Sequence, residues 1–283
     1  MAWNMFVMYH LALPRLRSVV TFLVVFGLLV GAAAQTGTPL GPPPAFSPAQ
    51  IDRLVGRIAL YPDPVLAQAM TAATFWSDIP AAAQWADQHR NLTGDALAKA
   101  IEEDQLAWDP SVLGLLPFPS VLDTMVRDMD WTQDLGAAVL TQRGEVMKAV
   151  QRLRASAWKY GYLRPNGYVN VIYADGFYSI LPLSPGVFYV PEYDPFVVFA
   201  EPRPGFAVAT AIRFGPGITI GATFRTWGWW TEPSIVWISD GILLGGNVWA
   251  RTRVNRGYYD HPYLHGWVRP VGPRVERHEV GRR

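Results

Sequence analysis

Carboxylates are the side chains of this chain whose types and spacing best suit catalysis. Six aspartates stand at prominent positions: Asp63, Asp109, Asp128, Asp130, Asp134 and Asp194. Two carboxylates held about 5–10 Å apart can hydrolyse a glycosidic bond, because one donates a proton while the other acts as base or nucleophile. Asp130 and Asp134 are four positions apart, so a helix would place both on one face. A carboxylate-dependent hydrolase of a cell-wall polymer would therefore use some of Asp63, Asp109, Asp130 and Asp134.

Helix capping is the alternative explanation for the same residues, and we favour it. Asp63, Asp109 and Asp194 each precede a proline. An Asp-Pro pair suits a helix start, because the carboxylate accepts a backbone N–H and the proline presets φ at the first helical position. Such a cap contributes about 1 kcal/mol to stability. The stretch 130–133 (DWTQ) also resembles a helix start. We therefore expect the candidate aspartates to cap helices.

The segment 58–70 (IALYPDPVLAQAM) makes the prediction for Asp63 specific. Pro62 would end a helix that begins near Pro48, because the residue before a proline avoids the α region. Asp63 would then cap the next helix, with Pro64 at its first position. We expect a sharp corner between two helices there, and no role for Asp63 in binding.

Motifs for metal binding and nucleophilic catalysis are absent from the sequence. The chain has no cysteine, which excludes disulfides, thiolate metal ligands and a cysteine nucleophile. His261 and His265 have helical spacing, but Pro262 and Gly266 oppose a helix, and no Glu follows as in an HExxH zinc motif. Neither a G-x-S-x-G elbow nor a GxxxxGKS/T loop occurs. The sequence therefore predicts no metal and no cofactor.

A cluster of tryptophans is the other candidate for function. Trp227, Trp229 and Trp230 lie so close together that strand alternation cannot bury all three on one face. Exposed tryptophans could bind a glycan, lie at a membrane surface or dock another envelope protein, and filling of a core is the alternative. The balance of 24 Lys+Arg against 23 Asp+Glu gives a net charge of +1, which does not indicate nucleic acid. Nothing in the sequence indicates the oligomeric state.

The first 34 residues have the order of a secretory signal peptide. Arg15 and Arg17 precede an apolar run over 18–31, and three alanines end the segment at Ala34. A basic region, an apolar region and an A-x-A site predict cleavage after about Ala34 and export to the periplasm or cell envelope. The run is shorter than the roughly 20 residues of a membrane helix, and an uncleaved anchor is the alternative. Because the arginines come late, translation could instead begin at Met8.

Composition and periodicity divide the rest of the chain into four parts. Residues 35–47 form a Pro/Gly-rich linker, and residues 48–162 show the apolar spacing and proline-marked starts of short helices. Residues 163–250 are aromatic-rich with strand patterns, and residues 251–283 form a basic tail whose composition is compatible with disorder. We therefore predict an α+β protein, with an N-terminal bundle of short helices, then a small antiparallel β domain, then the tail.

Two hairpin turns are predicted within the aromatic-rich part. Asp175-Gly176 separates two runs of β-branched and aromatic residues, which is a strong hairpin signal. Gly215-Pro216-Gly217 separates residues 206–212 from residues 218–224 and predicts a second hairpin.

Four phrases of the sequence together resemble one known family. They are IALYPDPVLAQAM (58–70), AWDPSVLGLLPFPSVLDTM (107–125), DWTQDLGAAVLTQRGEVMKAVQRLR (130–154) and VFYVPEYDPFVVF (187–199). Over about residues 48–200 the chain resembles the bacterial envelope family called domain of unknown function 3300. The resemblance implies an exported bacterial protein and supplies no catalytic residues. We expect a non-enzymatic binding or scaffolding module, with the carboxylate-dependent hydrolase as the alternative.

Overall fold

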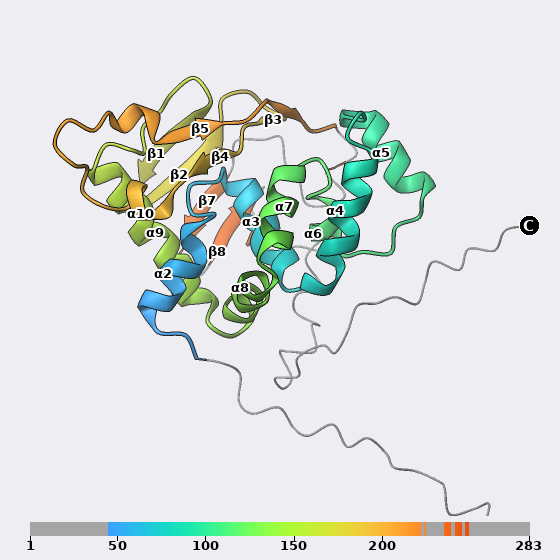
Figure 1. The fold of residues 1–283 in the computed structure, drawn as a ribbon, viewed down its shortest axis with the longest axis horizontal. Coiled ribbons are helices and arrows are strands. Elements are labelled where there is room, and N and C mark those ends of the chain that lie inside the picture. The colour runs from blue at the N-terminus through green and yellow to red at the C-terminus, as the bar shows by residue number, and fades with distance from the viewer. Residues whose placement is uncertain (1–44, 222–223, 225–234, 239–240, 245–246, 249–283) are drawn as a thin grey trace, which may run out of the picture. The chain divides into compact units, whose positions relative to one another are not determined.

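The computed structural model describes residues 45–221, 224, 235–238, 241–244 and 247–248 (Figure 1). The predicted signal peptide, the basic tail and Trp227, Trp229 and Trp230 lie outside these described residues. Within them the chain is α+β, as predicted, because short helices come first and antiparallel strands follow. None of the helices in the described ranges is long and apolar enough to cross a bilayer.

Short helices make up the first part of the described chain. They are α2 (Pro48–Gly56), α3 (Asp63–Ala73), the 3-10 turn η1 (Trp76–Asp78), α4 (Ile79–Gln88), α5 (Gly94–Glu103), α6 (Pro110–Leu113), α7 (Pro119–Arg127), α8 (Met129–Thr141) and α9 (Arg143–Lys159). Every residue of α3 is buried. A helix that is buried all round needs neighbours on each side, and α3 contacts α6, α8 and β2. It is therefore the central helix of the fold.

Short antiparallel strands follow the helices. They are β1 (Val169–Ala174), β2 (Phe177–Pro182), β3 (Val187–Phe188), β4 (Pro191–Tyr193), β5 (Ile212–Phe214), β6 (Ile218–Thr219), β7 (Ile235–Ile238), β8 (Gly241–Leu244) and β9 (Asn247–Val248), with α10 (Pro195–Val198) and η2 (Val208–Thr210) between β4 and β5. β1 pairs with β2 through Asp175 and Gly176, whose φ angles are 52° and 86°. Positive φ at both central residues is typical of a type I′ turn, so the first predicted hairpin is confirmed.

The second predicted hairpin is wrong, because β5 and β6 do not pair with each other. β5 pairs with β4, and β6 pairs with β3. The partners are Phe188 with Ile218 and Pro191 with Phe214, so two residues of one strand segment face three of the other. An extra residue of this kind defines a β-bulge. Residues 215–217 therefore form a bulge in a longer antiparallel ladder, where proline and glycine are tolerated because a ladder bond is already lost.

One hydrophobic core runs through both the helices and the strands. Phe188 and Val190 of the β3–β4 segment, together with Ile220, Phe224 and Trp237, belong to the same buried cluster as the helix residues. A smaller cluster joins the α9 residue Ala157 to buried residues of β1 and β2. The predicted domain boundary between residues 162 and 163 lies between α9 and β1 in the sequence. Both buried clusters contain residues from each side of this boundary.

Aspartates cap several helices, as the sequence predicts. Asp109 accepts a hydrogen bond from the N–H of Ser111 (2.9 Å), and Asp194 accepts one from the N–H of Phe196 (2.8 Å). At α8 the cap is Asp128, which accepts from the N–H of Trp131 at 3.0 Å. That N–H and the guanidinium of Arg57 lower the pKa of Asp128. The helix therefore begins ahead of Asp130, which is exposed in its first turn.

Asp63 is the exception, and the prediction that it caps a helix is wrong. The N-cap of α3 is Pro62, and no side chain accepts the free N–H groups of its first turn. The corner between two helices exists, but α2 ends at Gly56, well before Pro62. Turn residues connect it to α3, and Asp63 is the first helical residue rather than the cap.

Gly136 permits the close contact between α3 and α8. A Cβ atom at this position would lie 2.1 Å from the carbonyl oxygen of Ala73 and 3.1 Å from the Cα of Thr74. A separation of that size from backbone atoms cannot be relieved by rotating a side chain. Only glycine therefore allows the two helices to approach this closely.

Gly136→Ala is expected to lower the free energy of unfolding by about 1–3 kcal/mol or more, because α3 and α8 must move apart. The matched control is Gly144→Ala in α9, where an added Cβ meets nothing within 4 Å. That change should leave stability equal or raise it by up to about 1 kcal/mol, because alanine favours helix. Urea unfolding followed by circular dichroism measures both variants, and equal stability of the two would contradict the close-contact explanation.

Candidate functional site

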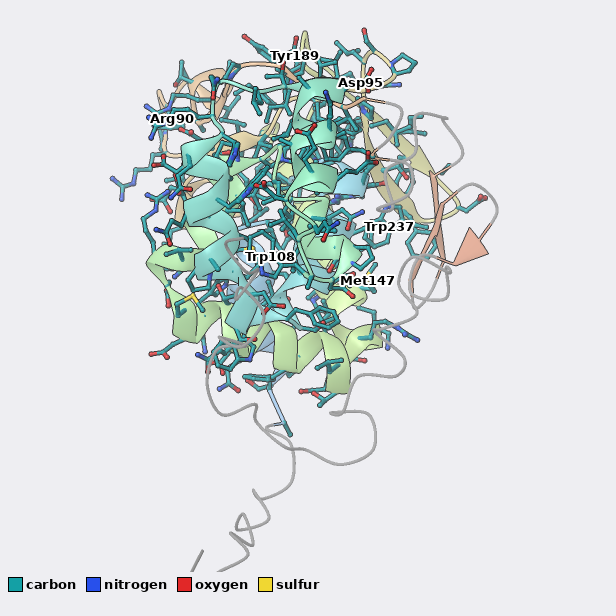
Figure 2. The ribbon with its side chains drawn as sticks, turned by 90° about the vertical axis from the view of Figure 1, so that its right-hand side faces the viewer. Arg90, Asp95, Trp108, Met147, Tyr189 and Trp237 are labelled. Carbon is teal, nitrogen blue, oxygen red and sulfur yellow. The ribbon has the colours of Figure 1, made fainter. Side chains whose placement is uncertain are left out.

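The carboxylate of Asp63 lies in a fully buried ion pair with Arg154. Both side chains have 0% exposure, and Nη1 of Arg154 donates to Oδ1 of Asp63 at 2.6 Å. Nε1 of Trp237, on β7 (Figure 2), donates to Oδ2 at 2.8 Å. The N–H of Ile180 on β2 lies 3.4 Å from Oδ1. Both carboxylate oxygens are therefore occupied, and neither faces solvent.

The remaining donors of Arg154 are used by backbone carbonyl groups. Nε donates to the carbonyl oxygen of Ala59 (2.8 Å), Nη1 to that of Tyr178 (2.8 Å) and Nη2 to that of Tyr61 (3.0 Å). The guanidinium also lies 5.0 Å from the ring centroid of Trp237. A buried charge is tolerated only when it is paired and hydrogen-bonded in this way. This cluster therefore joins elements of the fold and offers no group to a ligand.

Burial changes the proton affinity of several groups around the pair. It raises the pKa of Asp63, while Arg154, Trp237 and Ile180 stabilise the ionised form and oppose that change. Burial also raises the pKa of Tyr61 to about 12. The pKa of Tyr193, whose hydroxyl accepts a hydrogen bond from the N–H of Leu60 at 3.1 Å, lies well above its usual range for the same reason.

Asp63→Ala is expected to lower the free energy of unfolding by about 3–5 kcal/mol, because it leaves the charge of Arg154 buried without its partner. The double variant Asp63→Leu/Arg154→Met should cost less than the sum of Asp63→Leu and Arg154→Met measured singly, since it removes both charges together. Urea unfolding of the four variants gives these values. A cost of only about 1 kcal/mol for Asp63→Ala, as for a lost cap, would contradict the ion-pair explanation.

Stability should fall at alkaline pH because Tyr61 is buried. The folded pKa of Tyr61 is about 12 and its ordinary value is 10.0, so the folded state holds this proton more tightly than the unfolded state. The resulting stabilisation is complete below pH 10 and is lost as the pH rises through 12. Urea unfolding at a series of pH values measures the decline, and Tyr61→Phe should make it shallower. An unchanged slope in Tyr61→Phe would contradict this assignment.

The other candidate carboxylates are capping, exposed or half-buried residues of the described part of the chain. Asp109 also accepts a hydrogen bond from the hydroxyl of Ser111 (2.6 Å), next to its cap contact. Asp130 is exposed and Asp134 is half-buried, both on α8. None of these residues, nor Asp63, lines the two clefts described next.

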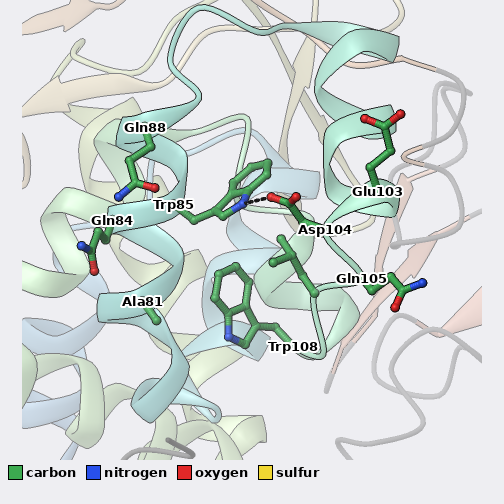
Figure 3. Close-up of a pocket in the computed structure, with 9 residues that line it drawn as sticks. Ala81, Gln84, Trp85, Gln88, Glu103, Asp104, Gln105 and Trp108 are labelled. Atoms are coloured by element: carbon green, nitrogen blue, oxygen red, sulfur yellow. Dashed lines mark hydrogen bonds between the residues drawn. The ribbon is translucent and has the colours of Figure 1, made fainter. Parts of the chain in front are cut away.

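An open cleft of about 550 Å³ lies between α4 and the segment that ends α5 (Figure 3). We call it the tryptophan cleft, and its lining residues are Ala81, Gln84, Trp85, Gln88, Glu103, Asp104, Gln105, Leu106 and Trp108. The α4 residues recur at helical spacing, so they share one face of that helix. Gln105, with a φ of 48°, turns the chain sharply after α5. That turn is followed by Leu106 and Trp108, which close the opposite side.

The indole of Trp85 is held rigidly at the inner side of the tryptophan cleft. Its Nε1 donates to Oδ2 of Asp104 at 2.7 Å (Figure 3). The ring of His89 stacks on it, with centroids 3.9 Å apart and an interplanar angle of 20°. Trp85 is only 9% exposed, whereas Trp108 is half-buried. Trp108 therefore offers more indole surface to a ligand.

Several polar groups of the tryptophan cleft make no hydrogen bond to protein. The amides of Gln84, Gln88 and Gln105 have no partner within the described part of the chain. Within the same described residues, Nε1 of Trp108 and Oδ1 of Asp104 also have no hydrogen-bond partner. The other carboxylate oxygen of Asp104, Oδ2, accepts the hydrogen bond from Trp85. Glu103 is used differently, because it pairs with Lys99 at 3.5 Å and its carboxylate points away from Asp104 (Figure 3).

A second cleft of about 480 Å³ lies where the helices meet the β3–β6 ladder. Its walls come from the end of α4, the starts of α5 and α7, β4 and the bulge at residues 215–217. Arg90 and Glu192 bring opposite charges to its lining. His89 lines this second cleft and stacks on Trp85, which lines the tryptophan cleft. The stacked pair His89 and Trp85 therefore separates the two clefts.

Sequence reasoning placed binding at Trp227, Trp229 and Trp230, which lie outside the described residues. It missed the tryptophan cleft. The available signal was Trp85 with Gln84 and Gln88 beside it on one helix, but nothing in the sequence shows that the turn after α5 brings Trp108 to the same place. That proximity is a property of the tertiary structure.

The fold and the cleft define a class of protein: an α+β chain with short helices, antiparallel strand pairs and an open cleft lined by aromatic residues. The chain belongs to the family described as Protein of unknown function (DUF3300), which matches residues 47–258. It is similar to the Uncharacterized protein YacH of Escherichia coli (strain K12), with 34% identity over 189 residues. That similarity covers 56% of this chain and 30% of YacH, so the chain spans less than a third of its relative's length. No solved structure matches.

Proposed function

We propose that this chain is an exported, non-enzymatic binding module of the cell envelope. The observation that carries the proposal is the composition of the tryptophan cleft. Two indoles and three unpaired amides line a cavity of about 550 Å³, within the range of about 300–1,000 Å³ typical of small-ligand sites. Groups of this kind bind a ligand without changing it, because amides and indoles neither transfer protons readily nor act as nucleophiles.

The carboxylates favour binding over hydrolysis. A glycoside hydrolase needs two carboxylates aimed at one bond. Asp109 accepts hydrogen bonds at a helix start, and Asp63 accepts them from Arg154 and Trp237. In the tryptophan cleft Asp104 holds Trp85, and Glu103 faces Lys99. Each of these four carboxylates therefore already has a partner in the protein, and Glu103 also points away from Asp104.

Export rests on the N-terminal sequence. Arg15 and Arg17, the apolar run over 18–31 and the alanines before Gln35 are the features of a cleavable signal peptide. A chain without cysteine is also compatible with an oxidising compartment, since no free thiol is present to be oxidised.

Crosslinking in living bacteria tests the proposed function. The complete precursor is produced with a photo-crosslinking amino acid at Gln84, which is exposed in the tryptophan cleft. We expect mature protein that begins near Gln35 by mass spectrometry, and an adduct in the envelope fraction after irradiation. The matched control carries the same amino acid at Asp123, which is exposed on α7 and lines neither cleft.

An adduct that forms from residue 84 and not from residue 123 supports a binding role for the tryptophan cleft. Equal adducts at both positions, or none at either, would contradict it. Protein that keeps its N-terminus and stays in the cytoplasm would contradict export.

A further inference from the structure

We propose that the tryptophan cleft binds a neutral oligosaccharide. This inference deepens the proposed function and rests on it. It assigns the ligand class from the chemistry of the lining residues: an aromatic surface, hydrogen-bonding groups of both kinds, and a charge that excludes anions.

The aromatic surface suits a pyranose ring. Trp108 is half-buried at the cleft, and Trp85 lies at its inner side. One face of many pyranose rings carries only C–H groups, which pack on an indole, while the hydroxyl groups point outward around the ring. Tryptophan combines a large apolar face with a polar N–H, so it can contact both parts of a sugar. The stacking of His89 and the hydrogen bond to Asp104 hold Trp85 in place before a ligand arrives, which lowers the entropy lost on binding.

The polar groups around these indoles match hydroxyl groups. A hydroxyl both donates and accepts, and each free amide of Gln84, Gln88 and Gln105 also does both. Nε1 of Trp108 adds a donor and Oδ1 of Asp104 adds an acceptor, both without protein partners in the region that the structure covers. An apolar ligand would remove these groups from water without replacing their hydrogen bonds, at a cost of about 1–3 kcal/mol each.

The charge of the cleft excludes the main competing ligands. Asp104 brings a negative charge to the cleft, and the described lining contains no Lys, Arg or His. Sugar acids, phosphates and nucleic acid would therefore meet like charge. An organic cation would be attracted, but an ammonium group accepts no hydrogen bonds. It would leave the N–H groups of Trp108 and of the three amides unmatched, and Glu103 already faces Lys99.

Binding is measured with the mature chain, residues 35–283, by nuclear magnetic resonance of its tryptophan indole N–H groups. The probes are two neutral tetrasaccharides, of β-1,4-linked glucose and of β-1,4-linked N-acetylglucosamine, each titrated to millimolar concentration. A tetramer of galacturonic acid and tetramethylammonium are the charged comparisons. We expect at least one neutral tetrasaccharide to shift the Trp85 and Trp108 signals with saturation, and the galacturonic acid tetramer to shift neither.

Variants then locate the site. Trp108→Ala and Gln84→Ala/Gln88→Ala should each weaken binding by about tenfold or more, the usual effect of removing a central aromatic or two hydrogen-bonding groups. The amide changes lie on the exposed face of α4, where alanine favours helix, so the fold should persist. The controls are Trp158→Ala, a half-buried tryptophan outside the cleft, and Glu102→Ala, an exposed residue of α5 that does not line it. Both should bind as the parent does.

The outcomes separate the ligand class from the proposed function. Saturating shifts with tetramethylammonium alone, or no shift of Trp108 with any neutral probe, would overturn the oligosaccharide assignment. Equal loss of binding in Trp158→Ala and Trp108→Ala would overturn the location. If the saccharides fail while the crosslink from residue 84 still forms in the envelope, the binding module stands and only its ligand class is wrong.

Discussion

Arg154 connects four parts of the chain from a position that solvent does not reach. Its donors reach the carbonyl groups of Ala59 and Tyr61, the carboxylate of Asp63 and the carbonyl of Tyr178, while Trp237 covers the guanidinium. Removing two charges from water costs several kcal/mol for each ion. The arrangement is therefore stable only when all of these segments are in place together. Apolar contacts in the shared core are less directional, whereas the hydrogen bonds of Arg154 and Asp63 fix how β2 and β7 lie against α3 and α9.

The buried ion pair of Arg154 also explains why Asp-Pro pairs have different roles at different places in the chain. Asp63, Asp109 and Asp194 all precede proline, and the last two cap their helices. Asp63 does not, because a guanidinium 91 residues away in sequence takes its carboxylate. Attraction between two opposite full charges is stronger in a buried site than near solvent, because the effective dielectric constant is lower there. The N-terminus of α3 consequently has no side-chain cap, and its first residue contributes to tertiary structure instead.

The tryptophan cleft depends on a different kind of constraint. One wall is a regular helix, so the positions of Gln84, Trp85 and Gln88 follow from helical spacing. The other wall is the turn after α5, which needs a positive φ at Gln105 to bring Trp108 back toward α4. The hydrogen bond from Trp85 to Asp104 joins the two walls. Binding residues on a turn supported by a helix are common, because turns can vary while the helix keeps its place.

The sequence by itself determined the order of the helices and strands, the hairpin at Asp175-Gly176 and the caps at Asp109 and Asp194, because each depends on residues close together in the chain. Only the tertiary structure decided that residues 212–219 pair with 187–193 instead of folding into a hairpin. It also decided that Asp63 binds Arg154 and that Trp85 and Trp108 share a cleft. These features depend on partners distant in sequence, which periodicity, capping preference and turn composition do not encode.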